Sequence, residues 1–523
     1  RFILTKAGMP YQSHNSRSLQ ANCFSTSLLT ERLMFQALTK PKTMFGIILT
    51  VLTLCAPTAL AAETGGGPHL DGKDLNLLYV APFVGMLLSI AVLPLTLPHF
   101  WHDHFGKISI FWALTFFVPF TIFFGFELAI FELLHVLLLE YFPFIIFLFA
   151  LFTISGGIRL KGRLVGTPIL NTGILLIGTI LASFMGTTGA AMLLIRPLCR
   201  AIDHRKHKVH TIVFFIFLVA NIGGSLTPMG DPPLLMGFLK GVSFLWPTQN
   251  MLLPMLLVSV ILLAVYYGLD RYFHTREDAI EPMDNIETGQ EGERLGVEGL
   301  VNLPLLFAVP AVMLLGVQFE KVLGEFLVYH VHVKGAFLLR DLSLLGIAGL
   351  SLWLTKNDSR QANGFTWFPI IEVALLFLGI FMTIVPAIAI LKAGSEGALA
   401  FVINTVTLAN GEPNNVAYFW ITGVLSGFLD NAPTYIVFFN AAGGDPEALM
   451  TTYRKTLLAI SAGAVFMGAL TYIGNAPNFM VRAIVEDRGI KMPSFFGYMA
   501  WSVCILIPVF VLVTFVFFVL DFG

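Results

Sequence analysis

The sequence predicts an all-α polytopic membrane protein made of two inverted repeats, each with a re-entrant hairpin and a broken transmembrane helix. Its composition indicates the membrane, because 56% of the 523 residues are hydrophobic, 12% are charged and the mean hydropathy is +0.81. Soluble chains carry about 25% charged residues, so the bilayer is the expected solvent. The repeats and their orientation follow from an internal similarity and from the placement of Lys and Arg.

The internal similarity joins two pairs of segments that contain Gly and Pro. Residues 182–189 (ASFMGTTG) match residues 426–433 (SGFLDNAP), and residues 224–233 (GSLTPMGDPP) match residues 468–477 (GALTYIGNAP), each 244 residues later. Paired interruptions at corresponding positions of two halves indicate the binding site of a secondary transporter. Unwound backbone survives in a bilayer only where protein or a water-filled cavity satisfies it. We therefore expect the interrupted segments to meet at one site.

Apolar runs long enough to span a membrane occur along most of the chain. Two other apolar stretches, 168–198 and 398–442, contain Gly, Pro and polar residues, which predicts that each enters the membrane and turns back. Residues 127–140 place Glu and His among leucines, which favours an interfacial amphipathic helix. The runs that could span lie near 75–98, 108–126, 141–158, 210–226, 250–270, 302–318, 337–355, 367–391, 455–472 and 494–520.

The chain divides at one long polar connection. Residues 75–270 form the first predicted repeat, 271–300 a cytoplasmic linker and 301–520 the second repeat. Residues 1–43 are expected to be a disordered extension or one that lies outside the natural reading frame. Residues 44–62 are typical of a signal peptide, with an uncleaved anchor helix as the alternative.

Lys and Arg in short loops predict the orientation. An external start followed by three spans places the basic group 159–163 in the cytoplasm, where the basic segment 200–208 also belongs. The stretch 168–198 must then enter and leave from the cytoplasmic face. An odd number of spans separates it from 398–442, so that stretch enters from outside and the repeat is inverted.

The interrupted segments carry a family resemblance. Residues 220–233 (ANIGGSLTPMGDPP) resemble the broken span of the ion transporter superfamily, which includes sodium/proton antiporters, arsenite-type permeases and citrate or dicarboxylate carriers. Residues 425–433 (LSGFLDNAP) resemble the second hairpin tip of the antiporter and arsenite-permease branches. The resemblance covers roughly residues 75–520 in architecture, with close motif matches only in these segments. It implies hairpins and broken helices that meet at the midplane, and a homodimer.

The two hairpin tips depart from one branch of that superfamily. Carboxylate carriers typically show Ser-Asn-Thr at the tips, whereas this chain has Gly186-Thr187-Thr188 and Asp430-Asn431-Ala432. This departure argues against a citrate-like substrate and favours a cation site.

Asp430 and Asp231 are the acidic residues of the predicted site and the candidate Na⁺ ligands. A charge at the bilayer centre costs about 2.5–3.5 kcal/mol on insertion scales, so each requires a compensating role. The alternative is that each caps a helix. The site is favoured for Asp430, and the two interpretations are nearly equal for Asp231, which precedes Pro232. The other candidates offer hydroxyl, amide or carbonyl oxygens, which Na⁺ prefers, and are Thr187, Thr188, Ser225, Thr227, Asn431, Thr471 and Asn475.

These features predict a secondary active transporter of the inner (plasma) membrane, a sodium/proton antiporter that works by alternating access. Na⁺ or H⁺ would be the coupling ion, with no cofactor. The alternative is a cation- or proton-coupled transporter of citrate, a dicarboxylate or an arsenite-type anion. The expected partners are the lipid bilayer and a small inorganic ion or small organic anion; a net charge of −1 gives no indication of nucleic acid.

An enzyme is not expected, because the sequence contains no GxSxG, HExxH or P-loop motif and no GxGxxG in a strand context. The four cysteines are scattered and form no CxxC pair, so neither a disulfide framework nor a thiolate metal site is indicated.

Overall fold

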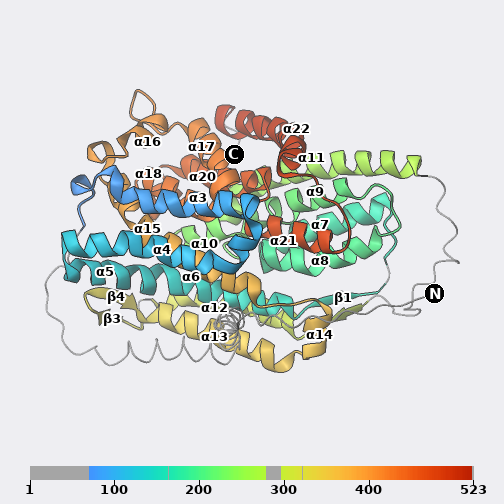
Figure 1. Cartoon of the computed structure of the whole chain (residues 1–523), viewed down its shortest axis with the longest axis horizontal. Coiled ribbons are helices and arrows are strands. Elements are labelled where there is room, and N and C mark those ends of the chain that lie inside the picture. The colour runs from blue at the N-terminus through green and yellow to red at the C-terminus, as the bar shows by residue number, and fades with distance from the viewer. Residues whose placement is uncertain (1–69, 163, 278–295, 321, 521–523) are drawn as a thin grey trace, which may run out of the picture. The chain divides into compact units, whose positions relative to one another are not determined.

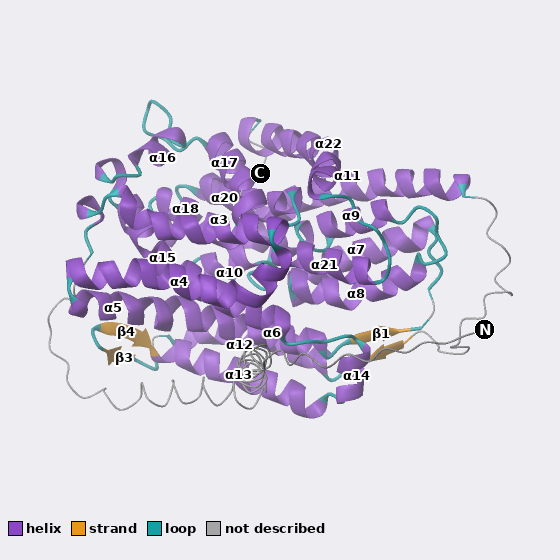
Figure 2. Ribbon diagram, in the orientation of Figure 1, coloured by secondary structure: helices purple, strands orange, loops and turns teal. Residues whose placement is uncertain are grey.

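The computed structural model describes residues 70–162, 164–277, 296–320 and 322–520. Helices make up most of this part of the chain (Figure 1 and Figure 2). Ten of the described helices are long and apolar enough to cross a membrane, which confirms the predicted all-α polytopic class. The predicted extension 1–43 and signal segment 44–62 lie outside the described residues, as does most of the predicted linker 271–300.

The first repeat opens with three spans. α3 (Ala81–Thr96) and α4 (Pro98–Phe124) are followed by one continuous helix, which consists of α5 (Phe126–Val136), a π turn (Leu137–Tyr141) and α6 (Phe142–Gly156). The interfacial helix predicted at 127–140 is therefore wrong, because these residues form the outer half of a span. Pro143 lacks an N–H yet does not break this helix, since the π turn before it has already shifted the helical hydrogen bonds.

The second repeat opens with three corresponding spans, α12 (Asn302–Phe319), α13 (Gly335–Leu354) and α15 (Phe368–Lys392). α15 packs on α4 and α3, and α13 packs on α6 and α12. We call these six spans the frame. Its connections contain β1 (Arg159–Lys161), which pairs antiparallel with β2 (Gly296–Glu298); β3 (Glu325–Val328), which pairs antiparallel with β4 (Val331–Lys334); α14 (Asn357–Ala362); and α16 (Ala400–Thr405).

Two helical hairpins have the same construction in the two repeats. α7 (Pro168–Met185) and α8 (Thr187–Ala201) form the first, and α17 (Asn415–Leu429) and α18 (Asn431–Ala441) form the second. The second arm of each hairpin packs on a corresponding frame span, α8 on α6 and α18 on α15. The two predicted turn-back segments are thus confirmed as hairpins, except that residues 398–414 of the second segment precede its hairpin and contain α16 and a loop.

Two broken helices follow the hairpins. In the first repeat, α9 (Val209–Leu218) leads through a 3-10 turn (Ile222–Leu226) to α10 (Pro232–Leu239); in the second, α20 (Arg454–Met467) leads through a 3-10 turn (Gly468–Leu470) to α21 (Ala476–Asp487). We call the hairpins and broken helices, with the helices after them, the site unit. Those following helices are α11 (Trp246–Arg276) and α22 (Phe495–Val513), the latter extended by a π turn (Thr514–Val519); α19 (Pro446–Met450) is a short connection.

The repeats are inverted. Between the two hairpins the described chain crosses the membrane through the broken helix α9–α10 and then through α11, α12, α13 and α15, an odd number of crossings. Figure 1 agrees, because β1 and the β3–β4 pair lie at opposite ends of the frame helices. The hairpins therefore enter from opposite faces.

Candidate functional site

The backbone takes the same path at equivalent positions of the two repeats. The hairpin tips Gly186 and Asp430 have φ values of +79° and +76°. The residues that end the breaks, Asp231 and Asn475, are both extended, with φ of −146° and −155°. A positive φ combined with ψ values of +149° at Gly186 and +143° at Asp430 is essentially confined to glycine, so Asp430 holds a strained conformation that Gly186 adopts freely in the first repeat.

The breaks depend on close backbone approaches. A Cβ atom on Gly230 would lie 2.0 Å from the carbonyl oxygen of Gly224, and one on Gly474 would lie 2.5 Å from that of Gly468. These pairs are equivalent in the two repeats. The matching glycines of the sequence repeat therefore mark the points where each break folds back on itself.

The Asp231 carboxylate is the centre of the site. Its Oδ1 accepts hydrogen bonds from Thr187 Oγ1 at 3.1 Å and from Asn475 Nδ2 at 2.9 Å, and its Oδ2 accepts one from Asn431 Nδ2 at 2.5 Å. All four side chains are buried. Asp231 and Asn475 are repeat equivalents, as are Thr187 and Asn431, so the two repeats contribute matched residues to one cluster.

Four helix N-termini converge on this cluster. α8 begins at Thr187 and α18 at Asn431, while Asp231 and Asn475 directly precede α10 and α21. The inverted repeat produces this convergence, because each helix begins at a break or tip rather than at a membrane face. The N-terminus of a helix carries a partial positive charge and unpaired N–H groups.

A chain of buried amides extends the cluster. Asn475 also donates to Asn221 Oδ1 at 3.3 Å, and Asn221 donates to Asn478 Oδ1 at 2.7 Å. Asn478 in turn donates to the carbonyl oxygen of Thr471 at 2.9 Å. Asn478 was not among the predicted site residues, and the signal for it was an amide among the apolar residues of the first half of α21.

Three of the predicted hydroxyl ligands bind backbone groups of the breaks. Thr227 donates to the Ser183 carbonyl, and Thr471 donates to the equivalent Gly427 carbonyl at 2.5 Å. Both also accept hydrogen bonds from the N–H two residues later. Ser225 donates to the Ile222 carbonyl at 2.8 Å. These hydroxyls hold each break in shape, and those of Thr227 and Thr471 also bind it to its hairpin; Thr188 lies half-buried beside Thr187.

The two acidic candidates, Asp430 and Asp231, make different contacts in the structure. The Asp430 side chain is half-buried and accepts a hydrogen bond from Ala432 N at 3.2 Å, so it caps α18. Asp231 makes no such cap and is bound by three side chains instead. Asp430 directly precedes Asn431, which donates to Asp231, so the two carboxylates belong to the same part of the molecule. Asp430 is therefore the helix cap that the alternative interpretation described, whereas Asp231 makes no cap and remains a candidate site residue.

One hydrogen-bond acceptor in the cluster around Asp231 receives no hydrogen bond. Asn431 Oδ1 is buried and has no hydrogen-bond partner, although the other end of this amide binds Asp231. Buried polar atoms are normally satisfied, so an open acceptor beside a carboxylate fits a donor or a cation that binds there. Within the described residues, no group of three or more His, Cys, Asp or Glu is placed to hold a metal ion.

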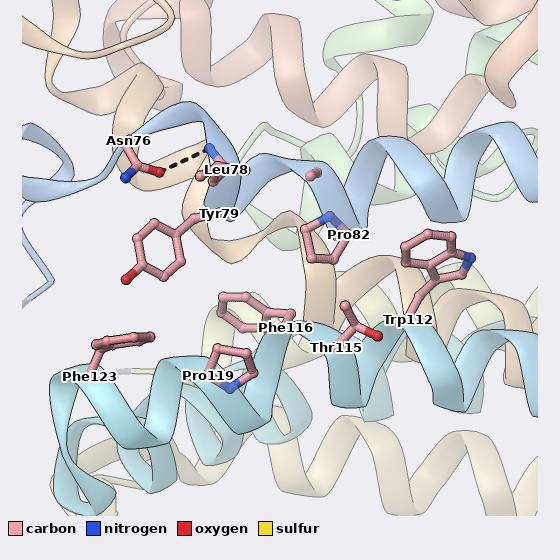
Figure 3. A pocket seen from close by; sticks show the side chains of 10 residues that line it. Asn76, Leu78, Tyr79, Pro82, Trp112, Thr115, Phe116, Pro119 and Phe123 are labelled. Atoms are coloured by element: carbon pink, nitrogen blue, oxygen red, sulfur yellow. Dashed lines mark hydrogen bonds between the residues drawn. The ribbon is translucent and has the colours of Figure 1, made fainter.

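The frame contains a cavity whose lining differs from the polar cluster around Asp231. It has a volume of about 490 Å³ and lies between α3 and α4, where Tyr79, Pro82, Trp112, Phe116 and Phe123 line it (Figure 3). Its lining is mostly apolar, and none of it comes from a hairpin or a broken helix. The polar cluster around Asp231 is therefore the candidate site.

Comparison with known proteins identifies the class of this protein. Residues 72–518 match a sequence family described as "Putative citrate transport". An uncharacterized transporter of Mycobacterium tuberculosis and one of Mycobacterium bovis are each 26% identical over 331 residues, which cover 62% of this chain and 71% of the relative. A "46 kDa membrane protein" of Mycobacterium leprae is 25% identical over 334 residues with the same coverage.

These matches agree with a multi-pass integral membrane protein of the plasma membrane that acts as a transporter and not as an enzyme. They are consistent with the ion transporter superfamily and do not single out its antiporter or arsenite-permease branches. Because the family match extends over most of the chain, this protein belongs to the family described as "Putative citrate transport".

Proposed function

We propose that this protein is a secondary transporter that moves a small organic anion of the citrate class together with Na⁺ or a proton. The observation that carries the proposal is the convergence of both repeats on Asp231, where buried donors, a carboxylate and four helix N-termini meet. This was the alternative interpretation of the sequence, and the family match favours it over the antiporter.

The helix N-termini support an anionic substrate. An N-terminus typically stabilises a nearby negative charge by about 0.3–1 kcal/mol, and by up to about 2 kcal/mol where it is partly buried. The ends of α8, α10, α18 and α21 act together here. A carboxylate can thus be bound without Lys or Arg, by N–H groups and by the amides of Asn431 and Asn475.

The Asp231 carboxylate supports a coupling ion. The three groups that bind it are uncharged, so an arriving substrate anion meets a second negative charge in a buried site. Burying like charges together is costly unless a proton or cation neutralises one of them. Asn431 Oδ1 supplies an open oxygen ligand beside Asp231 for such a cation. The transport of anion and cation is then coupled because neither binds well alone.

Sodium/proton antiport is the second candidate. The presence of Asp231 and Asp430 in the same part of the molecule favours it, because neighbouring carboxylates bind a proton or a hard cation in competition. In that case the site would exchange ions without any organic anion.

Flux into proteoliposomes tests the proposal. Radiolabelled citrate uptake is measured with an imposed Na⁺ gradient, with an imposed pH gradient and with neither, for the wild type and Asp231→Asn. Gradient-driven citrate uptake that is lost in the variant supports the proposal. Na⁺-driven proton movement without citrate uptake would replace it with antiport.

A further inference from the structure

A largely buried ion pair joins the frame to the site unit. Lys240 Nζ lies 2.5 Å from Glu140 Oε1, and the exposed fractions of the two side chains are 28% and 12%. Glu140 stands on the π turn between α5 and α6, whereas Lys240 directly follows α10. The pair therefore connects a frame span to the half-helix that begins at Asp231.

Other charges surround this pair. Glu132 and His135 of α5 and Lys392 at the end of α15 all interact electrostatically with Glu140. Lys392 also repels Lys240. These neighbours come from the frame, so Lys240 is the one member of the group that belongs to the site unit.

The site unit makes a second contact with the same frame helix, far along that helix from the Glu140–Lys240 ion pair. Ser155 Oγ donates to the Met185 carbonyl at 3.2 Å, directly before the hairpin tip Gly186. Ser155 is 15 residues beyond Glu140, a helical distance of about 22 Å. It precedes the last residue of α6, next to the basic strand β1 that the Lys and Arg pattern places in the cytoplasm. The polar site thus lies at the cytoplasmic end of the frame helix.

The ion pair lies on the external side of the site. α10 is a half-helix of eight residues that separates Asp231 from Lys240. Because this segment is rigid, Asp231 cannot move toward the external face along α6 while Lys240 stays at Glu140. The residue of the second repeat that is equivalent to Lys240 is Ile484, so the inverted repeat supplies no matching pair on the opposite side.

We propose that Glu140 and Lys240 are positioning residues whose ion pair holds the site unit against the frame where the site opens to the cytoplasm. The pair separates each time the site opens to the external face. This inference rests on the proposed transport function. Its direct consequence is that loss of the pair shifts the population toward the outward-open arrangement.

The accessibility of one cysteine tests the proposal without any substrate. Cys23, Cys55, Cys199 and Cys504 are replaced by Ser, and Thr188→Cys is introduced beside the first hairpin tip. A membrane-impermeant thiol reagent is applied to right-side-out and to inside-out vesicles. In the parent we expect reaction mainly from the cytoplasmic side.

Glu140→Gln and Lys240→Gln should each raise the external labelling rate several-fold, and the exchanged pair Glu140→Lys with Lys240→Glu should restore the low rate. The control is Glu320→Gln, which removes a Lys–Glu pair with Lys334 that lies wholly within the external part of the frame. It should leave labelling unchanged. If Glu140→Gln does not reach the membrane, Lys240→Gln provides the same test.

Unchanged labelling in a folded Lys240→Gln protein would overturn the proposal, as would an equal effect of Glu320→Gln. The measurement needs no transported substrate, so it remains valid if citrate uptake fails. Failure of the proposed function and failure of the positioning role are therefore distinguishable.

Discussion

At the scale of single residues, Asp231 differs from every other polar group of the site in receiving hydrogen bonds from both repeats. Its donors come from α8, α18 and the break before α21. A hydrogen bond to a charged group contributes about 1.5–3 kcal/mol, so the three together offset much of the cost of a buried charge. The carboxylate can then change partners when a ligand enters.

The first prediction concerns the charge of Asp231. Asp231→Asn keeps the size of the side chain, but its amide places a donor opposite the donors of Asn431 or Asn475. Loss of one such hydrogen bond corresponds to a fall of about 10- to 150-fold in transport rate, measured as citrate uptake. Normal uptake by a monodisperse variant would remove Asp231 from the site. The double variant with Asn475→Asp restores the carboxylate at the equivalent position of the second repeat and should recover part of the activity.

The second prediction concerns the tip residue Asp430. Asp430→Gly gives the second hairpin the tip residue of the first and relieves a positive φ, worth about 1–3 kcal/mol. It also removes the cap of α18, a loss of about 1 kcal/mol. We expect thermal stability in detergent to be unchanged or higher, and citrate uptake to fall far less than in Asp231→Asn. Equal loss of uptake in both variants would restore Asp430 to the centre of the site.

Sequence alone could not separate these two aspartates, for a physical reason. Both precede a half-helix, where a carboxylate can cap the helix or face a ligand. The choice for Asp231 is made by Asn431 and Asn475, which lie 200 and 244 residues away in the chain. The repeat pattern did predict that Asp231, Asn431 and Asn475 belong to one site. It did not predict that both asparagines donate to Asp231.

At the scale of elements, the breaks are held by backbone contacts that tolerate no side chain. The third prediction is that Gly230→Ala destabilises the first break, since its Cβ would meet the Gly224 carbonyl at 2.0 Å. Overpacking of this kind typically costs about 1–3 kcal/mol, which is measured as a lower melting temperature in detergent. The matched control is Gly173→Ala on α7, where a Cβ meets no atom within 4 Å. Equal melting temperatures of the two variants would contradict this account of the break.

The cytoplasmic end of α11 is joined to the loop between α8 and α9 by a buried guanidinium. Arg205 donates to Glu277 at 2.5 Å, to Asp270 at 3.0 Å and to the Gly166 carbonyl at 3.0 Å. Burial alone would raise the pKa of Glu277, but hydrogen bonds from the His207 N–H and from Arg205 hold that pKa below its ordinary value. The loop is thereby fixed to the helix that follows the first broken helix.

The fourth prediction follows from the sign of that shift. A lowered pKa in the folded state means that Glu277 stabilises the protein above its ordinary pKa, about 4.3, and that this stability is lost as pH falls through the lower folded pKa. Glu277→Gln should therefore lower the melting temperature at pH 7, with a difference that shrinks below about pH 4. The check is a melting series across pH for both proteins. A difference that stays constant from pH 7 to pH 3 would show that the charge of Glu277 is not the cause.

At the scale of the whole molecule, the inverted repeat explains why polar chemistry is concentrated in one place. Each half-helix on its own would expose unpaired N–H groups inside the bilayer. Two repeats that enter from opposite faces bring four such ends together, so that Asp231, Thr187, Asn431 and Asn475 satisfy one another. The frame contributes the surfaces of α6 and α15 on which the hairpin arms α8 and α18 rest.

Much of this architecture could be predicted from sequence because hydropathy and the 244-residue offset report it directly. The apolar run at 108–126 was predicted too short, since α4 already begins at Pro98 with His and Asp residues in its first turns. The segment 127–140 was misplaced because its Glu and His residues resemble an interfacial face. In the structure Glu140 is paired with Lys240, which belongs to another part of the chain. Local patterns cannot reveal a partner of this kind.

The last prediction tests the inversion itself. Lys206, in the loop after the first hairpin, and Asn410, in the loop before the second, are both exposed. Since an odd number of described spans separates the hairpins, these loops lie on opposite faces of the membrane. In the cysteine-free background, Lys206→Cys should react with an impermeant reagent only from the cytoplasm, and Asn410→Cys only from outside. Positions 206 and 410 are in solvent in any arrangement of the site unit, so their labelling does not depend on the face to which the transport site opens. Reaction of both from the same face would mean that the repeats are parallel, and four helix N-termini could not then meet at Asp231.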